Sequence, residues 1–107
     1  MEDNSIIKLN GVIRLLGRRI TELRRAFGWS QVQLAEKLNI TKQTVSNWEN
    51  ENIQPSVEML MRIASLFHVT TDYLLGLDEA QYLCVDGLPV SFVAHLAQII
   101  EDYKNKT

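Results

Sequence analysis

The sequence has a single cysteine, Cys84, so no disulfide can form within the chain, which is typical of a protein from a reducing cytoplasm. It has no long apolar run, because pairs such as Leu74-Leu75 and Ile99-Ile100 are far too short to span a bilayer. Its first apolar pair follows acidic residues, Glu2 and Asp3, a charge pattern that signal peptides do not have. We therefore expect a cytoplasmic protein with no membrane partner.

The sequence also lacks the residue patterns of an enzyme or a metal site. Cys84, His68 and His95 are too scattered for the spacing of metal ligands. No glycine-rich phosphate loop and no nucleophile–base pair is present. We expect no enzymatic activity, no cofactor and no metal, and a redox-sensing role for Cys84 is the one alternative that these residues leave open.

The net charge of −2 is distributed unevenly along the chain. Residues 1–50 carry eight basic and five acidic residues, a net charge of +3, whereas residues 51–107 carry three basic and eight acidic residues, a net charge of −5. A positive half can face nucleic-acid phosphates while an acidic half faces away. Ordinary scatter of surface charge is the alternative, since an excess of +3 does not decide the matter.

The apolar periodicity and the helix-capping residues predict an all-α domain over residues 12–77, preceded by an N-terminal extension, residues 1–11. Apolar residues recur at helical spacing from Ile13 to Phe27, and Gly28 ends this first helix. Ser30 and Gln33 fit the capping box of a second helix, which Asn39 ends. Capping residues predict three further helices: Lys42 to about Asn50 after Thr41, one beginning at Pro55-Ser56, and Thr71–Leu75 between Thr70 and Gly76.

Residues 78–107 differ in character from the five-helix domain. Tyr82–Val85 is a short β-prone run before an Asp86-Gly87 turn, and Pro89 fits the first turn of a final helix. That helix carries an apolar stripe, which comprises Phe92, Val93, Leu96, Ile99, Ile100 and Tyr103. The stripe either packs on the five helices or forms a partner surface. We expect a homodimer through this helix, with Tyr82–Val85 adding a strand that pairs within the chain or with the partner's copy.

The segment Gln31–Asn50 carries the functional signal. It contains two short helices joined by a tight turn over residues 38–41, and its apolar residues fix the angle between them: Leu34, Ala35, Ile40, Val45 and Trp48. The polar residues of the second of these helices then point away from the core: Lys42, Gln43, Thr44, Ser46 and Asn47. A helix with such a face fits the major groove of DNA, whereas the alternative is a face that is merely solvated.

Residues 16–76 resemble the Cro/CI repressor type of helix-turn-helix protein, also called the xenobiotic response element family. The resemblance is carried by Leu23-Arg24-Arg25, Gly28-Trp29-Ser30-Gln31, Leu34-Ala35, residues 41–50, Pro55-Ser56 and residues 72–76. It implies a five-helix DNA-binding fold. Our first hypothesis is therefore a sequence-specific transcriptional regulator, in the first instance a repressor, that binds a near-palindromic double-stranded operator as a homodimer.

The resemblance also implies roles for individual residues. Gln31 would bind a phosphate at the start of the second helix, and Lys42, Gln43 and Asn47 would contact base edges. We also expect base contacts from Thr44 and Ser46, and phosphate contacts from Thr41, Asn50 and Asn52. Arg24 and Glu49 would form a partly buried ion pair between the first and third helices, although both could instead contact DNA. Trp29 and Trp48 are expected in the core or at a hinge rather than stacked on bases.

The sequence departs from the family pattern in the loop after the third helix. Glu51 stands where a glycine is usual, and Asn52–Gln54 includes none of the basic residues usual there. Asn39 likewise replaces a glycine that is common in the turn. The loop favours a second hypothesis, a protein-interaction module of the same fold that acts as an antitoxin or as an antagonist of another regulator.

Overall fold

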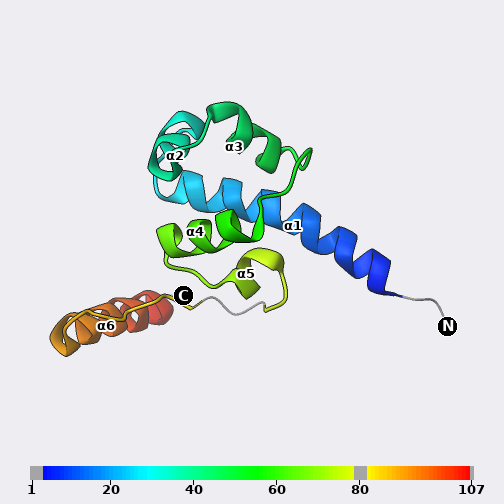
Figure 1. Ribbon diagram of the computed structural model, residues 1–107. Helices are drawn as coiled ribbons and strands as arrows, with labels where there is room; N and C mark the ends of the chain where they lie inside the picture. The colour runs from blue at the N-terminus through cyan, green and yellow to red at the C-terminus, as the bar shows by residue number, and fades with distance from the viewer. Residues whose placement is uncertain (1–3, 79–81, 107) are drawn as a thin grey trace.

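The computed structural model describes the backbone of residues 4–78 and 82–106 and the side chains from Leu15 onward. These residues form six α-helices and no strand, so the predicted all-α class is confirmed (Figure 1). The helices are α1 (Asn4–Ala26), α2 (Gln31–Leu38), α3 (Lys42–Glu49), α4 (Val57–Phe67), α5 (Thr71–Leu75) and α6 (Val90–Lys106). Helices α1 to α5 form one body, and α6 lies apart from it at the end of an extended segment (Figure 1).

Helix α1 is longer than its sequence pattern predicted. It begins at Asn4 rather than Ile13, so residues 4–11 are helical and continuous with the rest of α1. A single glycine inside a helix costs only about 1 kcal/mol, so Gly11 does not interrupt a long helix. The other end lies close to its predicted position, because α1 stops at Ala26 and Gly28 has a φ of 77°.

The predicted helix caps are confirmed. The side chains of Ser30, Thr41, Ser56 and Thr70 each accept the backbone N–H three residues later, which satisfies one donor that a helix start leaves unpaired. The capping box of Ser30 is complete, since the Gln33 side chain accepts the Ser30 N–H in return. Short local signals therefore fix where these helices start.

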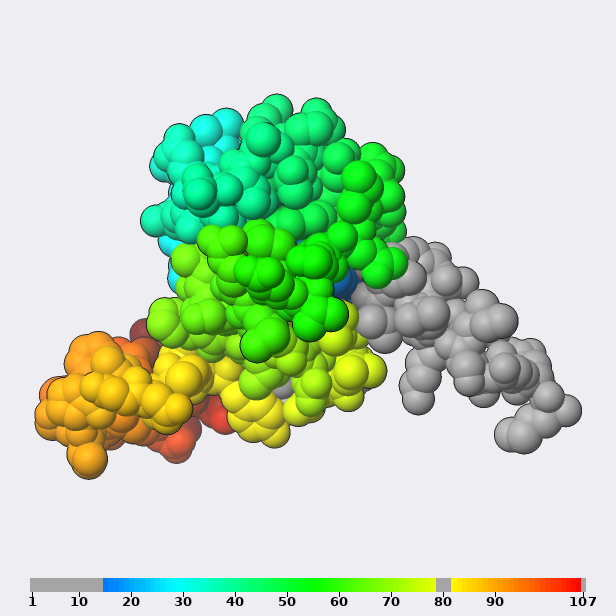
Figure 2. Space-filling model, in the orientation of Figure 1, coloured from blue at the N-terminus to red at the C-terminus, as the bar shows by residue number. Residues whose placement is uncertain are grey.

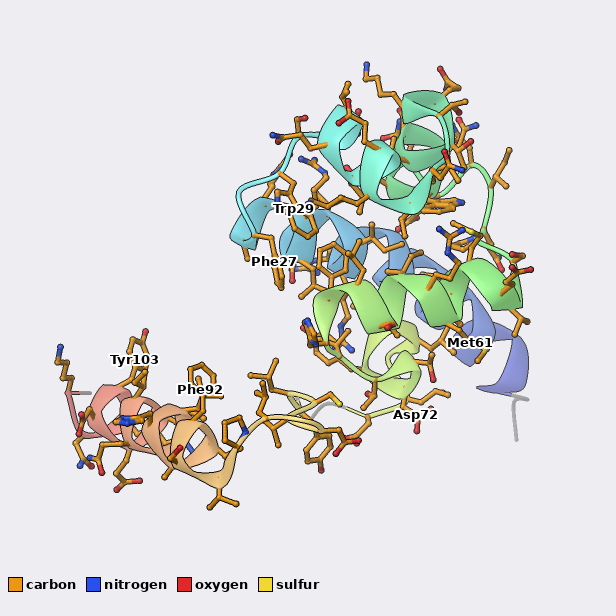
Figure 3. The ribbon with its side chains drawn as sticks, turned by 60° about the vertical axis from the view of Figure 1, so that its left-hand side comes forward. Phe27, Trp29, Met61, Asp72, Phe92 and Tyr103 are labelled. Atoms are coloured by element: carbon orange, nitrogen blue, oxygen red, sulfur yellow. The ribbon has the colours of Figure 1, made fainter. Side chains whose placement is uncertain are left out.

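One apolar core joins the five helices of the body. Helix α1 packs against α3 and α5, α2 against α3, and α4 against α5. The buried apolar residues are Leu16, Ile20, Leu34, Ala35, Leu38, Val45, Trp48, Ile63, Ala64, Phe67, Tyr73 and Leu74. Not every apolar residue of α4 lies in this core, because Val57 and Met61 are 75% and 61% exposed; Figure 3 shows Met61 on the outer side of α4.

Two close contacts fix α1 against its neighbours. A Cβ atom on Gly17 would lie 2.6 Å from the carbonyl oxygen of Trp48, so only glycine allows α3 to lie this close to α1. The Arg19 guanidinium lies 4.0 Å from the ring centroid of Tyr73 in α5 and donates a hydrogen bond to the Tyr73 carbonyl. The position of α3 on the body is therefore set by backbone packing against α1.

An aromatic cluster holds the entry to α2. The rings of Phe27, Trp29 and Phe67 lie with centroids 5.0 to 5.5 Å apart, and the Lys37 ammonium lies 4.4 Å from the Trp29 centroid (Figure 3). Trp29 thus packs beside the core, as the sequence predicted, and Phe27 lies just beyond the end of α1 with 41% of its surface exposed.

The segment before α6 is extended but forms no strand in the part of the chain described. Cys84 donates its backbone N–H to the His68 carbonyl at 3.3 Å, which is a single bond rather than a ladder. The expectation that Tyr82–Val85 pairs as a strand within its own chain is therefore wrong, because β-prone residues need a neighbouring edge to pair with. Figure 2 shows α6 and this segment as a lobe beside the body, and α6 has no buried residue.

Candidate nucleic-acid interface

Helices α2 and α3 are joined by a turn that depends on a left-handed residue. Asn39 has φ 56° and ψ 48°, a conformation that asparagine adopts more readily than most residues. The Ile40 N–H then donates to the Ala35 carbonyl at 2.9 Å, which closes the end of α2, and Thr41 caps the start of α3. The chain therefore reverses within three residues and holds the two helices at a fixed angle.

Helix α3 has one buried side and one polar side. Val45 and Trp48 are buried against the body. The five residues predicted to contact bases lie on the rest of the helix: Lys42 and Gln43 are exposed, and Thr44, Ser46 and Asn47 are half-buried. The predicted polar face is thus accessible to a ligand.

Hydrogen bonds between side chains order this polar face. Gln43 Nε2 donates to Asn47 Oδ1 at 3.1 Å, one helical turn away. At the C-terminal end, Asn50 Nδ2 donates to Ser46 Oγ at 3.3 Å. At the N-terminal end, the hydroxyls of Thr41 and Thr44 lie 2.9 Å apart. These hydrogen-bonded groups are each held near one orientation, which lowers the entropy lost when they bind a ligand.

The residues predicted to contact phosphate lie at the ends of α2 and α3. Thr41 precedes α3, and Asn50 and Asn52 follow it, all three exposed. Gln31 is the first residue of α2, where unpaired backbone N–H groups favour an anion. The Gln31 side chain is half-buried and donates its Nε2 to Glu49 Oε1 at 3.1 Å, a contact that nothing in the sequence indicated.

Arg24 of α1 and Glu49 of α3 form a buried ion pair. Arg24 Nε and Nη2 lie 2.7 and 3.0 Å from the two carboxylate oxygens of Glu49, a bidentate geometry, and the side chains are 10% and 6% exposed. The structure thus brings together the two residues that the family resemblance paired.

The ion pair shifts the pKa values of both partners. Burial acts to raise the pKa of Glu49, but hydrogen bonds from Arg24 and Gln31 and the arginine charge outweigh it, so the Glu49 pKa is below its ordinary value. The hydrogen bond to Glu49 raises the pKa of Arg24. Both groups are therefore charged at neutral pH, and Glu49 is fully engaged within the protein.

The loop after α3 begins with a strained residue. Glu51 has a φ of 63° in the left-handed region, where a glycine would fit without steric cost. The Asn52 N–H nevertheless donates to the Asn47 carbonyl at 2.9 Å, which terminates α3. Glu51 therefore adopts the left-handed conformation that favours the glycine usual at this position.

Several basic residues of the first half of the chain are committed to groups within the protein. Besides the pairing of Arg24, Arg18 Nε lies 3.1 Å from Glu22, and Arg19 stacks on Tyr73. The ion pairs join charges that the net +3 of residues 1–50 already sets against each other, so they leave that excess unchanged but hold these guanidinium groups at partners within the protein.

The remaining candidate residues do not form a second site in the described part of the chain. Cys84 is exposed, and it lines a surface pocket with His68 and Asp86. Among residues 4–78 and 82–106, no group of three histidine, cysteine or carboxylate side chains is arranged to hold a metal ion. No helix over the same residues is both long and apolar enough to cross a membrane.

Comparison with known proteins connects this geometry to a family. A family model described as helix-turn-helix matches residues 20–74, just over half of the chain, and covers both α2 and α3. The chain belongs to the Cro/CI-type helix-turn-helix family.

Named relatives of this helix-turn-helix chain are regulators. It is 44% identical over 64 residues to the HTH-type transcriptional regulator ImmR of Bacillus subtilis (strain 168), and the matched region covers 60% of this chain and 50% of ImmR. It is 33% identical over 70 residues to the HTH-type transcriptional regulator SinR of Bacillus licheniformis, and the matched region covers 64% of this chain and 63% of SinR.

A solved structure extends the likeness beyond the matched domain. The crystal structure of a transcriptional regulator from Listeria innocua superposes with a TM-score of 0.55 at 26% identity, over 85% of each chain.

The curated relatives are longer than the matched region, since the chain spans about half the length of ImmR and just under two thirds of SinR.

Proposed function

We propose that this protein is a sequence-specific transcriptional regulator of the cytoplasm that inserts α3 into the major groove of duplex DNA and represses by occupying its operator. The observation that carries the proposal is the division of α3: Val45 and Trp48 fix it to the body, while its outer face carries ordered polar groups. The major groove admits an α-helix and presents a distinct pattern of donors and acceptors for each base pair.

The side chains of α3 supply chemistry for contacts with bases. Lys42 suits guanine O6 and N7, and Gln43 and Asn47 suit adenine N6 and N7. The hydrogen bond between Gln43 and Asn47 supports their action as a unit on adjacent base pairs. Thr44 and Ser46 add hydroxyls, and the Thr44 methyl group can contact a thymine methyl.

Phosphate contacts at the ends of the helices would set the position of α3 in the groove. Gln31 and the backbone N–H groups at the start of α2 would bind one phosphate. Thr41, Asn50 and Asn52 would bind others with neutral groups. Because few of these contacts are cationic, we expect DNA affinity to fall less steeply with salt than it does for proteins with many lysine or arginine contacts.

Helix α6 would supply the homodimer interface through Phe92, Val93, Leu96, Ile99, Ile100 and Tyr103. Its alternative role, packing against the five helices, has little support, since Phe92 and Tyr103 are 48% and 71% exposed and project from the same side of α6 (Figure 3). A fully buried apolar side chain stabilises by about 1.5–3 kcal/mol, so burying the exposed part of each of the larger ones adds about 1–2 kcal/mol.

A dimer through α6 would leave α3 uncovered, because the two helices lie on opposite sides of the molecule in Figure 1. Two copies of α3 would then bind half-sites about 34 Å apart, or a multiple of that distance. Tyr82–Val85 would contribute to the same interface.

Selection of bound sites from random duplexes tests DNA binding and half-site spacing together. We expect a near-palindromic sequence with half-sites separated by whole turns of the duplex. Recovery of no enriched sequence would contradict the proposal.

Sedimentation tests the dimer with matched variants of α6. Ile99→Asp places a charge within the apolar stripe, whereas Ala94→Asp adds the same charge on the opposite side of the helix. We expect Ile99→Asp to give monomers with weak operator binding and Ala94→Asp to remain dimeric. Truncation after Leu77 should likewise leave a folded monomer, and a monomeric full-length protein at micromolar concentration would contradict this interface.

The loop after α3 favours one alternative, a protein-interaction module of the same fold. Residues 51–55 include no basic residue, and Arg18, Arg19 and Arg24 are engaged within the chain. Retention on random duplex DNA distinguishes the two functions, since a DNA-binding protein is retained at low salt and released as the salt concentration rises. Absence of retention at any salt concentration would favour the interaction module.

A further inference from the structure

The carboxylate of Glu49 is the centre of a network that joins three helices. Its Oε2 accepts a hydrogen bond from Arg24 Nε at 2.7 Å, and its Oε1 accepts from Arg24 Nη2 at 3.0 Å and from Gln31 Nε2 at 3.1 Å. The third nitrogen of the guanidinium, Nη1, donates to the Trp29 carbonyl at 2.8 Å, two residues before Gln31. The same network therefore holds both the side chain of Gln31 and the backbone that leads into α2.

The chemistry of Glu49 determines which end of the Gln31 amide faces inward. An ionised carboxylate only accepts hydrogen bonds, so it binds the amide nitrogen and repels the amide oxygen. The amide nitrogen carries two hydrogens, of which Glu49 engages one. The second remains available for an outside acceptor at the N-terminus of α2, where a phosphate is favoured.

The network also keeps Glu49 ionised and in place. The bidentate pair with Arg24 fixes the plane of the carboxylate, and the pKa of Glu49 is below its ordinary value despite burial of the group. Without this anion, the Gln31 amide could rotate and present its oxygen, which would repel a phosphate.

We propose that Glu49 is a positioning residue for DNA binding, which orients the Gln31 amide so that its N–H is directed at a backbone phosphate. The inference rests on the proposed function, because it assigns a cause to the phosphate contact of Gln31. It gives the ion pair a role in affinity in addition to its role in holding α1 and α3 together.

A double-mutant cycle in DNA binding tests this role. The variants are Gln31→Ala, Glu49→Gln and the two together, each titrated against the same random duplex at a temperature where circular dichroism shows it folded. We expect Gln31→Ala and Glu49→Gln each to weaken binding about tenfold, as loss of one hydrogen bond to a charged group does. If Glu49 acts through Gln31, the double variant binds no more weakly than Gln31→Ala alone.

Two outcomes overturn the inference in different ways. If Glu49→Gln weakens binding by its full factor in the Gln31→Ala background, Glu49 has only a structural role and the proposed function stands. If Gln31→Ala binds as tightly as the unmodified protein, the phosphate role of Gln31 fails and this inference fails with it.

A second variant serves if Glu49→Gln does not fold. Arg24→Lys keeps the positive charge but loses the parallel hydrogen bonds that fix the carboxylate. We expect it to weaken DNA binding in the Gln31 background and to have no effect in the Gln31→Ala background. An equal loss in both backgrounds would overturn the positioning role.

Discussion

Replacing Glu51 with glycine should stabilise the protein, although it removes a side chain and adds flexibility to the unfolded chain. Glu51 has a φ of 63°, and the left-handed region costs an L-residue roughly 1–2 kcal/mol through contact of its Cβ with the backbone. Glycine avoids this cost, but its greater freedom in the unfolded state returns about 0.4–1 kcal/mol. The expected net gain from the backbone is about 1 kcal/mol.

Glu51→Ala is the matched control for the charge and the side chain. Glu51 is exposed and follows the C-terminus of α3, where a negative charge opposes the helix dipole by about 0.3–1 kcal/mol. Alanine removes that charge and the side chain but keeps the Cβ atom and its steric cost. The difference between the two variants therefore isolates the left-handed backbone.

Thermal and urea unfolding followed by circular dichroism measure both variants. A gain of 1 kcal/mol raises the Tm of a small domain by about 4–8 °C. We expect Glu51→Gly to exceed Glu51→Ala by roughly this amount, and to bind random duplex at least as tightly as the unmodified protein because one acidic group beside the phosphates is gone. Equal stabilities of the Glu51→Gly and Glu51→Ala variants would refute the strain at this position.

Two further predictions concern the contacts of α1. Gly17→Ala should destabilise the fold by about 1–3 kcal/mol in urea unfolding, because its Cβ would lie 2.6 Å from the Trp48 carbonyl oxygen; an increase in stability, as expected for alanine in an open helix, would contradict the close contact. The free energy of unfolding should also fall as the pH drops below about 4.5, the ordinary pKa of glutamate, since the Glu49 pKa is lowered in the folded state and protonation breaks its pair. This fall in the free energy of unfolding should be smaller in Glu49→Gln than in a control variant of the exposed Glu36. Equal pH dependence in the two variants would contradict the assignment of the effect to Glu49.

Local chemistry made much of the fold predictable from the sequence. Ser30 and Thr41 mark helix starts because the side chain of each accepts a backbone N–H, and Gln33 completes the capping box of Ser30. Asn39 marks a helix end because it adopts a left-handed φ. Such signals act within a few residues, so they can be recognised without knowledge of the rest of the fold.

The errors arose where a local signal was ambiguous or where the outcome depends on distant parts of the chain. The start of α1 was misplaced because Gly11 interrupts the pattern without ending the helix. Tyr82–Val85 has strand-forming residues but pairs with no neighbouring strand in the described structure. Burial of the apolar residues of α4 likewise depends on the other helices, since Met61 is apolar yet 61% exposed.

The sequence predicts which residues form the polar face of α3, but it does not predict the hydrogen bonds that join α3 to the other helices. The spacing of Lys42, Gln43 and Asn47 around the buried Val45 and Trp48 follows from helical geometry. The contact of Gln31 with Glu49 joins residues from two helices and could come only from the structure. His68 ends α4 at a φ of 58°. Histidine, like asparagine, is enriched in the left-handed region, so it is a local signal for the end of a helix.

The central claim is that α3 contacts base edges, and the affinity of Gln43→Ala for a selected operator and its single-base variants tests it most directly. We expect a loss of about 1–3 kcal/mol on the preferred site, together with lost discrimination at one base pair. Gln31→Ala is the control, since loss of a phosphate contact should weaken binding to all of these duplexes by a similar factor. Normal binding of Gln43→Ala with unchanged base preference would contradict the account.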